Sequence, residues 1–121
     1  MKIFVLDDMP IRIKWFRKHW PDMDHADNPP DAIEFLRNNK YEMIFLDNDL
    51  GGAPYVRGER GDGIDLAIMM AKEKIQTATP IIVHSLNFDG AHNIVAALKD
   101  THTDVRRIPY NEVMRIIENE D

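Results

Sequence analysis

The spacing of hydrophobic residues along the chain is the feature that most restricts its fold. Short apolar stretches alternate five times with longer stretches in which apolar residues recur every three or four positions. The short stretches predict strands at residues 2–6, 23–26, 43–46, 80–85 and 104–108. The longer stretches predict helices at residues 10–20, 29–40, 63–75, 110–119 and around 91–98. Strands that are apolar without alternation are typical of a parallel sheet covered by helices on both faces.

The order of these elements predicts an α/β fold with a doubly wound parallel sheet. Right-handed crossovers leave few topologies, and we expect the flavodoxin-like, receiver-type (βα)5 order 2-1-3-4-5. That order places the weakest strand, residues 23–26, at an edge. The 121 residues show no repeat and no linker, so we expect one receiver-like domain over residues 1–121.

The predicted helices each carry an apolar face. Asp62 is a plausible cap for the third helix, and Asn38 and Asn39 are a stop signal for the second. We expect the Trp15, Phe16 and Trp20 group to pack in the core or against a helix rather than stack on bases. Ile33 and Leu36 are expected to face the core. The other positions at helical spacing are Ile13, Phe16, Trp20, Ile64, Ala67, Ile68, Ala71, Ile75, Ala91, Ile94, Val95 and Leu98.

The composition excludes several classes of function. A formal charge of −6 argues against extended binding to duplex nucleic acid, which depends on Lys and Arg at the phosphates. The absence of cysteine excludes disulfides and thiolate metal sites. No apolar stretch approaches membrane-spanning length, so we expect a cytoplasmic protein without membrane contact. A small anionic ligand at one local site remains compatible with this charge.

Acidic residues follow two of the strongest predicted strands. The first strand ends in VLDDMP and the third in FLDNDL. Because the two strands should be neighbours, we expect Asp7, Asp8, Asp47 and Asp49 to converge at the carboxyl edge of the sheet. Carboxylates so close together resist ionisation, and we expect a bound Mg²⁺ or Mn²⁺ to make the crowding tolerable. The alternative is that these acids only cap helices.

Segments along essentially the whole chain resemble the response-regulator receiver domain. The resemblance implies that Asp7 and Asp8 hold Mg²⁺ and that Asp47 is the phosphoacceptor carboxylate. It further implies that the backbone at Asp49 adds a ligand and that Ser85 contacts phosphoryl oxygens. The segments are FVLDDMP, IFLDNDL, GDGIDLA, PIIVHS and RIPY.

One position departs from the receiver pattern. Receivers have a lysine directly before the last proline, and this chain has Ile108 there. Arg106 and Arg107 are close in sequence, but neither is a secure substitute. The segments LDNDLGG and HSLNFDG look instead like the cyclic-phosphate processing receiver domain, a divergent family proposed to act on cyclic phosphates such as those left in processed RNA.

That resemblance implies a metal-dependent hydrolase acting on a cyclic nucleotide or on an RNA end that carries a cyclic phosphate. A metal at Asp7, Asp8 and Asp47 would activate water, and His84 would serve as acid or base. Asp49 is a candidate second base or outer metal ligand. Ser85, Asn87 and the backbone N–H at Gly90 would bind phosphate oxygens at a helix N-terminus.

Several of these residues have a structural alternative. His84 and Ser85 are adjacent on a strand, so only one of them is expected to face the site. Asn87 and Asp89 are also good helix caps. The basic side chains Arg57 and Arg60 lie in a long loop, residues 48–61, where we favour solvation over closure on a substrate. The remaining histidines, expected at the surface, are His19, His25, His92 and His102.

Two other functions remain open. The chain could be a stand-alone receiver phosphorylated on Asp47, against which Ile108 counts. It could also be a non-catalytic pseudo-receiver that binds a protein partner through the helix at residues 110–119.

Overall fold

Five parallel strands form one sheet in the order β2-β1-β3-β4-β5, which confirms the predicted topology. The computed structural model describes residues 1–51 and 57–119. The strands are β1 (Ile3–Leu6), β2 (Asp24–Ala26), β3 (Met43–Leu46), β4 (Ile81–Val83) and β5 (Val105–Arg107). The helices are α1 (Pro10–His19), α2 (Pro29–Asn38), α3 (Gly63–Glu73), α4 (Phe88–Leu98) and α5 (Tyr110–Asn119).

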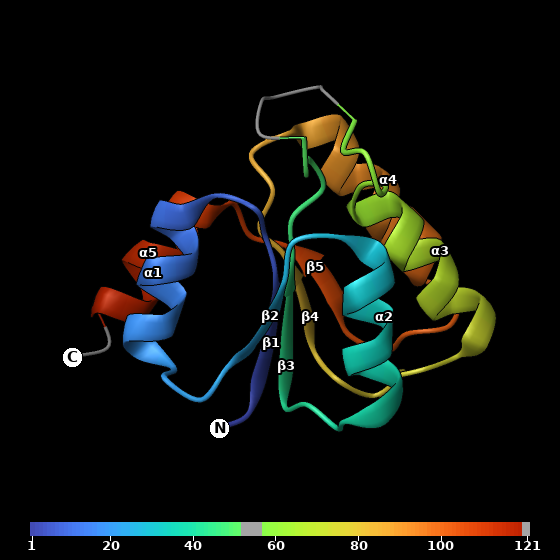
Figure 1. Cartoon of the computed structure of the whole chain (residues 1–121), viewed down its shortest axis with the longest axis horizontal. Coiled ribbons are helices and arrows are strands. Elements are labelled where there is room, and N and C mark those ends of the chain that lie inside the picture. The colour runs from blue at the N-terminus through green and yellow to red at the C-terminus, as the bar shows by residue number, and fades with distance from the viewer. Residues whose placement is uncertain (52–56, 120–121) are drawn as a thin grey trace.

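The helices form two layers, one on each face of the sheet. Helices α1 and α5 cover one face, and α2, α3 and α4 cover the other (Figure 1). Because successive strand residues point to opposite faces, Phe4 and Leu6 join the core beneath α2, α3 and α4. Ile3 and Val5 join a smaller core beneath α1 and α5. Every residue of β1 is therefore buried, which explains its unbroken apolar sequence.

The strand register aligns the tips of the three central strands. Val5 pairs with Phe45, and Leu46 pairs with Val83. The ladder continues past the strand ends, since Asp47 N donates to Leu6 O at 2.9 Å and His84 N to Leu46 O at 3.0 Å. The residues that follow β1, β3 and β4 therefore lie side by side at one edge of the sheet.

Asp62 closes the long loop after β3 and begins α3. Its Oδ1 accepts from Leu50 N at 3.1 Å and from Gly58 N at 2.9 Å. Asp65 Oδ2 accepts from the backbone N of Asp62 at 2.8 Å, which completes a capping box. The predicted cap at Asp62 is thus confirmed. Part of the predicted loop, residues 52–56, lies outside the described residues.

Two expectations about single residues were wrong. Ile68 was grouped with the apolar face of α3, but 54% of it is exposed, because α3 buries Leu66 and Met70 beside Ala67. Two overlapping apolar stripes run along this helix, and periodicity alone could not choose between them. His102 was assigned to the surface, but it is buried, and its Nε2 donates to Ile75 O at 2.7 Å.

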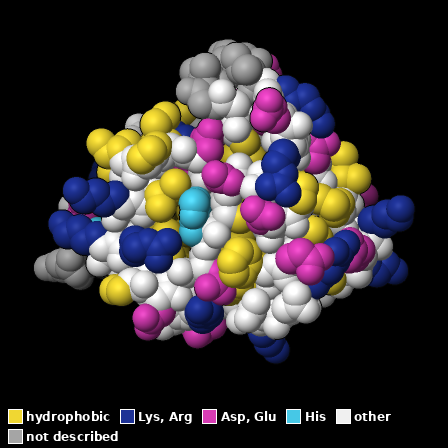
Figure 2. Space-filling model, viewed as in Figure 1, with side chains coloured by type: hydrophobic (Ala, Val, Ile, Leu, Met, Phe, Trp, Pro, Cys, Tyr) yellow, Lys and Arg dark blue, Asp and Glu magenta, His cyan; other side chains and the backbone are white. Residues whose placement is uncertain are grey.

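The surface carries mixed charges. In the view of Figure 2, acidic and basic side chains lie interspersed, without a continuous basic surface over the described residues of this face. None of the helices within residues 1–51 and 57–119 is both long and apolar enough to cross a membrane.

Candidate functional site

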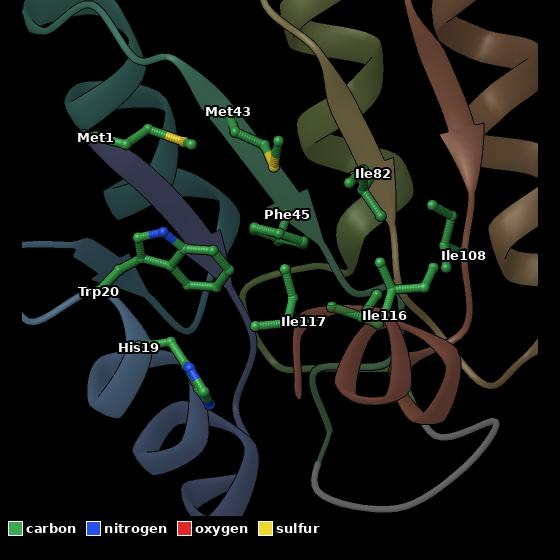
Figure 3. A pocket seen from close by; sticks show the side chains of 10 residues that line it. Met1, His19, Trp20, Met43, Phe45, Ile82, Ile108, Ile116 and Ile117 are labelled. Atoms are coloured by element: carbon green, nitrogen blue, oxygen red, sulfur yellow. The ribbon is translucent and has the colours of Figure 1, made fainter. Parts of the chain in front are cut away.

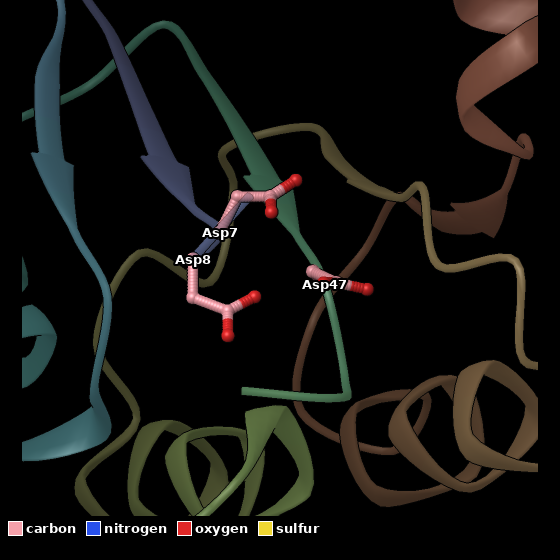
Figure 4. A group of neighbouring side chains, drawn as sticks. All are labelled: Asp7, Asp8 and Asp47. Atoms are coloured by element: carbon pink, nitrogen blue, oxygen red, sulfur yellow. The ribbon is translucent and has the colours of Figure 1, made fainter. Parts of the chain in front are cut away.

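Three carboxylates gather at the carboxyl edge of the sheet. Asp7 and Asp8 follow β1, and Asp47 follows β3 (Figure 4). One carboxylate oxygen from each of the three lies within 4.8 Å of the others. Asp7 and Asp47 are buried, whereas Asp8 is half-buried. The predicted convergence of these three side chains is therefore present in the structure.

Arg12, on the first turns of α1, supplies positive charge inside this cluster. Its Nε lies 2.9 Å from Asp7 Oδ2, and its Nη2 lies 3.1 Å from both Asp7 Oδ1 and Asp47 Oδ2. Only 13% of the Arg12 side chain is exposed. The expectation that only a bound cation makes the crowding tolerable is corrected, because the chain brings its own guanidinium to two of the three carboxylates.

Arg12 was not predicted from the sequence, although a signal was present. The helix at residues 10–20 begins three residues after Asp7, so its first turn starts beside the tip of β1. An arginine in that turn is within reach of the acids at the strand ends. Guanidinium groups match carboxylates well because their planar fork donates to two oxygens at once.

His84 lies on the same face of the sheet as Asp7 and Asp47. Its Nε2 is 2.8 Å from Asp7 Oδ2, and the imidazole is fully buried. The ring packs against Phe16, with centroids 5.2 Å apart, and against Tyr110 at 6.4 Å. His84 thus orients the Asp7 carboxylate through this hydrogen bond. The predicted role of His84 in proton transfer stays a prediction.

The environment separates the acidities of the two buried carboxylates. Burial would raise the pKa of Asp7, but the hydrogen bond and charge of His84, together with Arg12, outweigh it and lower the pKa. Burial raises the pKa of Asp47 to about 6, with a further contribution from the charge of Asp7 and partial opposition from His84 and Arg12. Asp7 therefore stays ionised at neutral pH, while Asp47 titrates close to it.

The residues predicted to bind phosphate lie between β4 and the first turn of α4. Asn87 Oδ1 accepts from Gly90 N at 3.1 Å, so Asn87 caps α4. The Ser85 hydroxyl accepts from Asn87 N at 3.1 Å and is buried. A Cβ at position 90 would lie 2.5 Å from Asn48 Nδ2, so a larger residue there would displace the Asn48 amide. Phosphate binding by these residues stays a prediction.

Asp49 lies outside the carboxylate cluster. Its Oδ1 accepts from Asn48 Nδ2 and from Asn87 Nδ2, both at 3.2 Å. The expected convergence of Asp49 with the other three acids is therefore not found, because its side chain links the end of β3 to the cap of α4. Its predicted roles as base or metal ligand stay predictions.

The position of the receiver lysine is apolar here. Ile108 lies with Trp20, Phe45, Ile82 and Ile117 around a pocket of about 440 Å³ between α1 and α5 (Figure 3). This pocket lies over the sheet on the α1 and α5 side, and its lining is mainly apolar. The cation beside Asp47 therefore comes from α1 and not from the end of β5.

The two arginines of β5 have other partners. Arg106 is exposed and its Nε lies 3.2 Å from Asp104 Oδ1. The Arg107 guanidinium donates to the backbone oxygen of Ser85, from Nη2 at 3.1 Å. Neither therefore takes the place of a lysine at residue 108.

A family model described as the cyclic-phosphate processing receiver domain matches residues 1–100. The chain belongs to this family. The match covers β1 to α4, and thus the three carboxylates of the cluster together with Arg12 and His84. No curated protein matches the chain.

Solved response-regulator structures share the fold of this cyclic-phosphate processing receiver domain. A two-component response regulator from Clostridium difficile has 19% identity and a TM-score of 0.65, over 100% of this chain and 98% of that one. The TrrA response regulator from Thermotoga maritima, in complex with Mg²⁺-BeF, has 17% identity and a TM-score of 0.64, over 98% and 96%. A Francisella response regulator receiver domain has 23% identity and a TM-score of 0.63, over 98% and 93%.

The loop arginines of this receiver domain pair with acids at its surface. Arg57 Nη2 lies 2.8 Å from Asp65 Oδ2, and Arg60 Nη2 lies 3.5 Å from Asp31 Oδ1. Both arginine side chains are exposed. This arrangement agrees with the solvated loop that the sequence favoured.

Proposed function

We propose that the protein is a metal-dependent phosphoesterase that opens a cyclic phosphate ester. The observation that carries the proposal is the cluster of Asp7, Asp8 and Asp47 with Arg12 between two of them, in a member of the cyclic-phosphate processing receiver family. The guanidinium can offset charge on a phosphate, and the three carboxylates can bind a hard cation and move a proton. The expected substrates are cyclic nucleotides and RNA ends that carry a cyclic phosphate.

The donor set suits a hard divalent cation. Carboxylate oxygens of Asp7 and Asp8, with Asp47 beside them, are ligands that Mg²⁺ and Mn²⁺ prefer. A bound ion would lower the pKa of its water and withdraw charge from the phosphate oxygens. Arg12 contacts carboxylate oxygens of Asp7 and Asp47, so we expect it to yield some of these contacts when an ion binds.

The released guanidinium of Arg12 would bind the non-bridging oxygens of the substrate. Its planar fork donates to two phosphate oxygens at once, which fixes the orientation of the phosphorus atom as well as its charge. In this proposal Arg12 supplies the cation that Ile108 cannot.

We expect Asp47 to transfer the proton, because its carboxylate lies beside the Asp7 and Asp8 oxygens that would hold the ion. As the base, it would accept a proton from the attacking water. The water oxygen forms a bond to phosphorus, the ring P–O bond breaks, and the protonated Asp47 returns the proton to the departing alkoxide. The product is a phosphomonoester with one free hydroxyl. His84 acts through Asp7 as a positioning residue, because it is buried and touches Asp7 rather than solvent.

The proposal is tested with 2′,3′-cyclic nucleotides and with RNA that ends in a 2′,3′-cyclic phosphate. Each is incubated with the protein in Mg²⁺, in Mn²⁺ and in EDTA, and the ring-opened product is quantified. We expect metal-dependent turnover that falls about 100-fold or more in Asp47→Asn.

The matched control is Asp22→Asn. It removes an exposed carboxylate that precedes β2, at the amino-terminal ends of the strands and away from the site at their carboxyl ends. It should retain wild-type turnover. The proposal fails if the wild type opens none of these substrates in either metal, or if Asp47→Asn turns over as fast as Asp22→Asn.

A second function, phosphorylation on Asp47 as in a receiver, is favoured by one contact. Arg12 Nη2 lies 3.1 Å from Asp47 Oδ2, so a cation adjoins the phosphoacceptor position even though residue 108 is isoleucine. Incubation with acetyl phosphate and Mg²⁺, followed by intact-protein mass spectrometry, tests this function. It predicts one acid-labile phosphoryl group that is absent from Asp47→Asn, and an unmodified wild type would exclude it for this phosphodonor.

A further inference from the structure

We infer that Phe88, flanked by Arg107 and His92, is a stacking platform for the nucleobase of the substrate. The protein would therefore prefer cyclic phosphates of nucleosides over cyclic phosphates without a base. This inference rests on the proposed function only for the place where the phosphate binds.

Phe88 is an aromatic side chain left open to solvent beside the polar site. It is the first residue of α4, and 65% of it is exposed. Leu86, two residues earlier in the same turn, is 58% exposed. Single exposed apolar residues are common on protein surfaces, so the case for a ligand surface depends on the groups beside Phe88.

Two further planar groups flank the Phe88 ring. The guanidinium carbon of Arg107 lies 5.5 Å from the ring centroid, within range of a cation–π interaction. The His92 ring is nearly parallel to the Phe88 ring, at an interplanar angle of 12° and a centroid distance of 6.3 Å. Stacked arginine and aromatic groups are the surfaces on which proteins hold unpaired bases.

The chain fixes this platform in place. Arg107 donates to the backbone oxygen of Ser85 from Nε at 3.3 Å and from Nη2 at 3.1 Å, so its guanidinium is held in the β4–α4 turn. Phe88 and His92 are one helical turn apart on α4. A base would thus meet groups that need little ordering on binding, which favours affinity.

The platform adjoins the carboxylate cluster. The Asn48 amide, next to Asp47 in sequence, packs against Gly90 on the first turn of α4, and Asn87 donates to Asp49. Figure 1 shows α4 beginning near the edge of the sheet where β3 and β4 end. A substrate with its phosphate at Asp47 can therefore direct its base along the β4–α4 turn.

The chemistry of this surface favours a single base over a protein partner. The exposed apolar residues Leu86 and Phe88 alternate in sequence with the polar residues Asn87 and Asp89, so they do not form a continuous apolar patch. Protein interfaces of ordinary size need some twenty to thirty residues on each side. A flat ring that stacks on Phe88 needs only this turn, and the net charge of −6 argues against an extended strand.

The test compares two ligands by titration calorimetry in Mg²⁺: 2′,3′-cyclic AMP and glycerol 1,2-cyclic phosphate, which has no base. The ring-opened product is quantified after each titration, so that binding and turnover are measured separately. The variants are Phe88→Ala, Phe88→Trp and Ile68→Ala, the last removing another exposed apolar side chain, from α3. We expect Phe88→Ala to weaken binding of the nucleotide about tenfold, Phe88→Trp to retain it, and Ile68→Ala to leave it unchanged. Binding of glycerol cyclic phosphate should be the same in all four proteins.

The outcomes separate this inference from the proposed function. Equal nucleotide affinity in the wild type and Phe88→Ala, or no nucleotide binding by the wild type, would overturn the platform. Ring opening of both ligands that is indifferent to Phe88 would support the proposed function alone. Nucleotide binding that depends on Phe88 without ring opening would support the platform and count against the proposed hydrolysis.

Discussion

The two faces of the sheet are built from the same strands but are packed differently. The face beneath α2, α3 and α4 is a continuous apolar core, in which the strand residues Phe4, Leu6, Ile44 and Leu46 are fully buried. The face beneath α1 and α5 has a smaller apolar core, an apolar pocket of about 440 Å³, and the buried polar row Asp7, Asp47 and His84.

This difference indicates that one layer mainly stabilises the fold and the other carries the candidate site. Burial of apolar side chains supplies most of the folding free energy, and the larger cluster of buried apolar side chains lies beneath α2, α3 and α4. Buried charges cost free energy unless they are paired, so the layer that carries the candidate site depends on Arg12 and His84 to remain folded. Substitutions on the two faces should therefore have different consequences.

The largest effect is expected from a cavity in the tightly packed face. Leu66→Ala removes a fully buried side chain of α3 and should lower the free energy of unfolding by about 4 kcal/mol. Ile117→Ala, on the wall of the apolar pocket, should cost only about 1 kcal/mol, since that side chain is half-buried. Urea denaturation of both variants measures the difference. Equal losses would show that the two layers are equally packed.

The next effect concerns the charge of Arg12. In EDTA, Arg12→Gln should lower the free energy of unfolding by about 3 kcal/mol, because Asp7 loses its guanidinium partner inside the protein. Mg²⁺ should then stabilise Arg12→Gln more than the wild type, since no guanidinium competes for the carboxylates.

The matched control for Arg12 is Arg17→Gln, an exposed arginine in the last turn of the same helix. It should change the thermal midpoint little, with or without Mg²⁺. If Mg²⁺ shifts both arginine variants and the wild type equally, Arg12 does not compete with the ion.

The smallest effect concerns the protonation of Asp47. Its pKa is raised to about 6 in the native state, so between pH 4 and 6 the native state binds more protons than the unfolded chain. Stability from this group therefore falls as pH rises through that range. In EDTA, Asp47→Asn should be about 2 kcal/mol more stable than the wild type at pH 7.5, and the gap should narrow to less than about 1 kcal/mol as the pH falls to 4.5.

Denaturant melts of Asp47→Asn and of the surface control Asp22→Asn, repeated across this pH range, measure the gap. A gap that is independent of pH, or one that widens toward pH 4.5, would contradict the raised pKa of Asp47.

Most of the fold was predictable because its signals are local. The apolar runs, the helical periodicity and caps such as Asp62 depend on residues close together in sequence. The convergence of Asp7, Asp8 and Asp47 was also predictable, since strand order alone brings the tips of β1 and β3 together. The motifs further indicated the family to which the chain belongs.

The contacts that define the site were not predictable in the same way. Nothing in the sequence states that Arg12 reaches Asp47, which is 35 residues away, or that His84 turns toward Asp7, which is 77 residues away. The exposure of Ile68 and the separation of Asp49 from the other acids likewise depend on how helices pack against one another.

By itself, the sequence determined the parallel sheet, its strand order and the edge at which acidic side chains collect. The tertiary structure alone decided which cation neutralises them, which histidine nitrogen meets Asp7, and how strongly burial raises the pKa of Asp47. The reason is that periodicity is a property of neighbouring residues, whereas charge pairing and desolvation depend on distances between groups far apart in the chain.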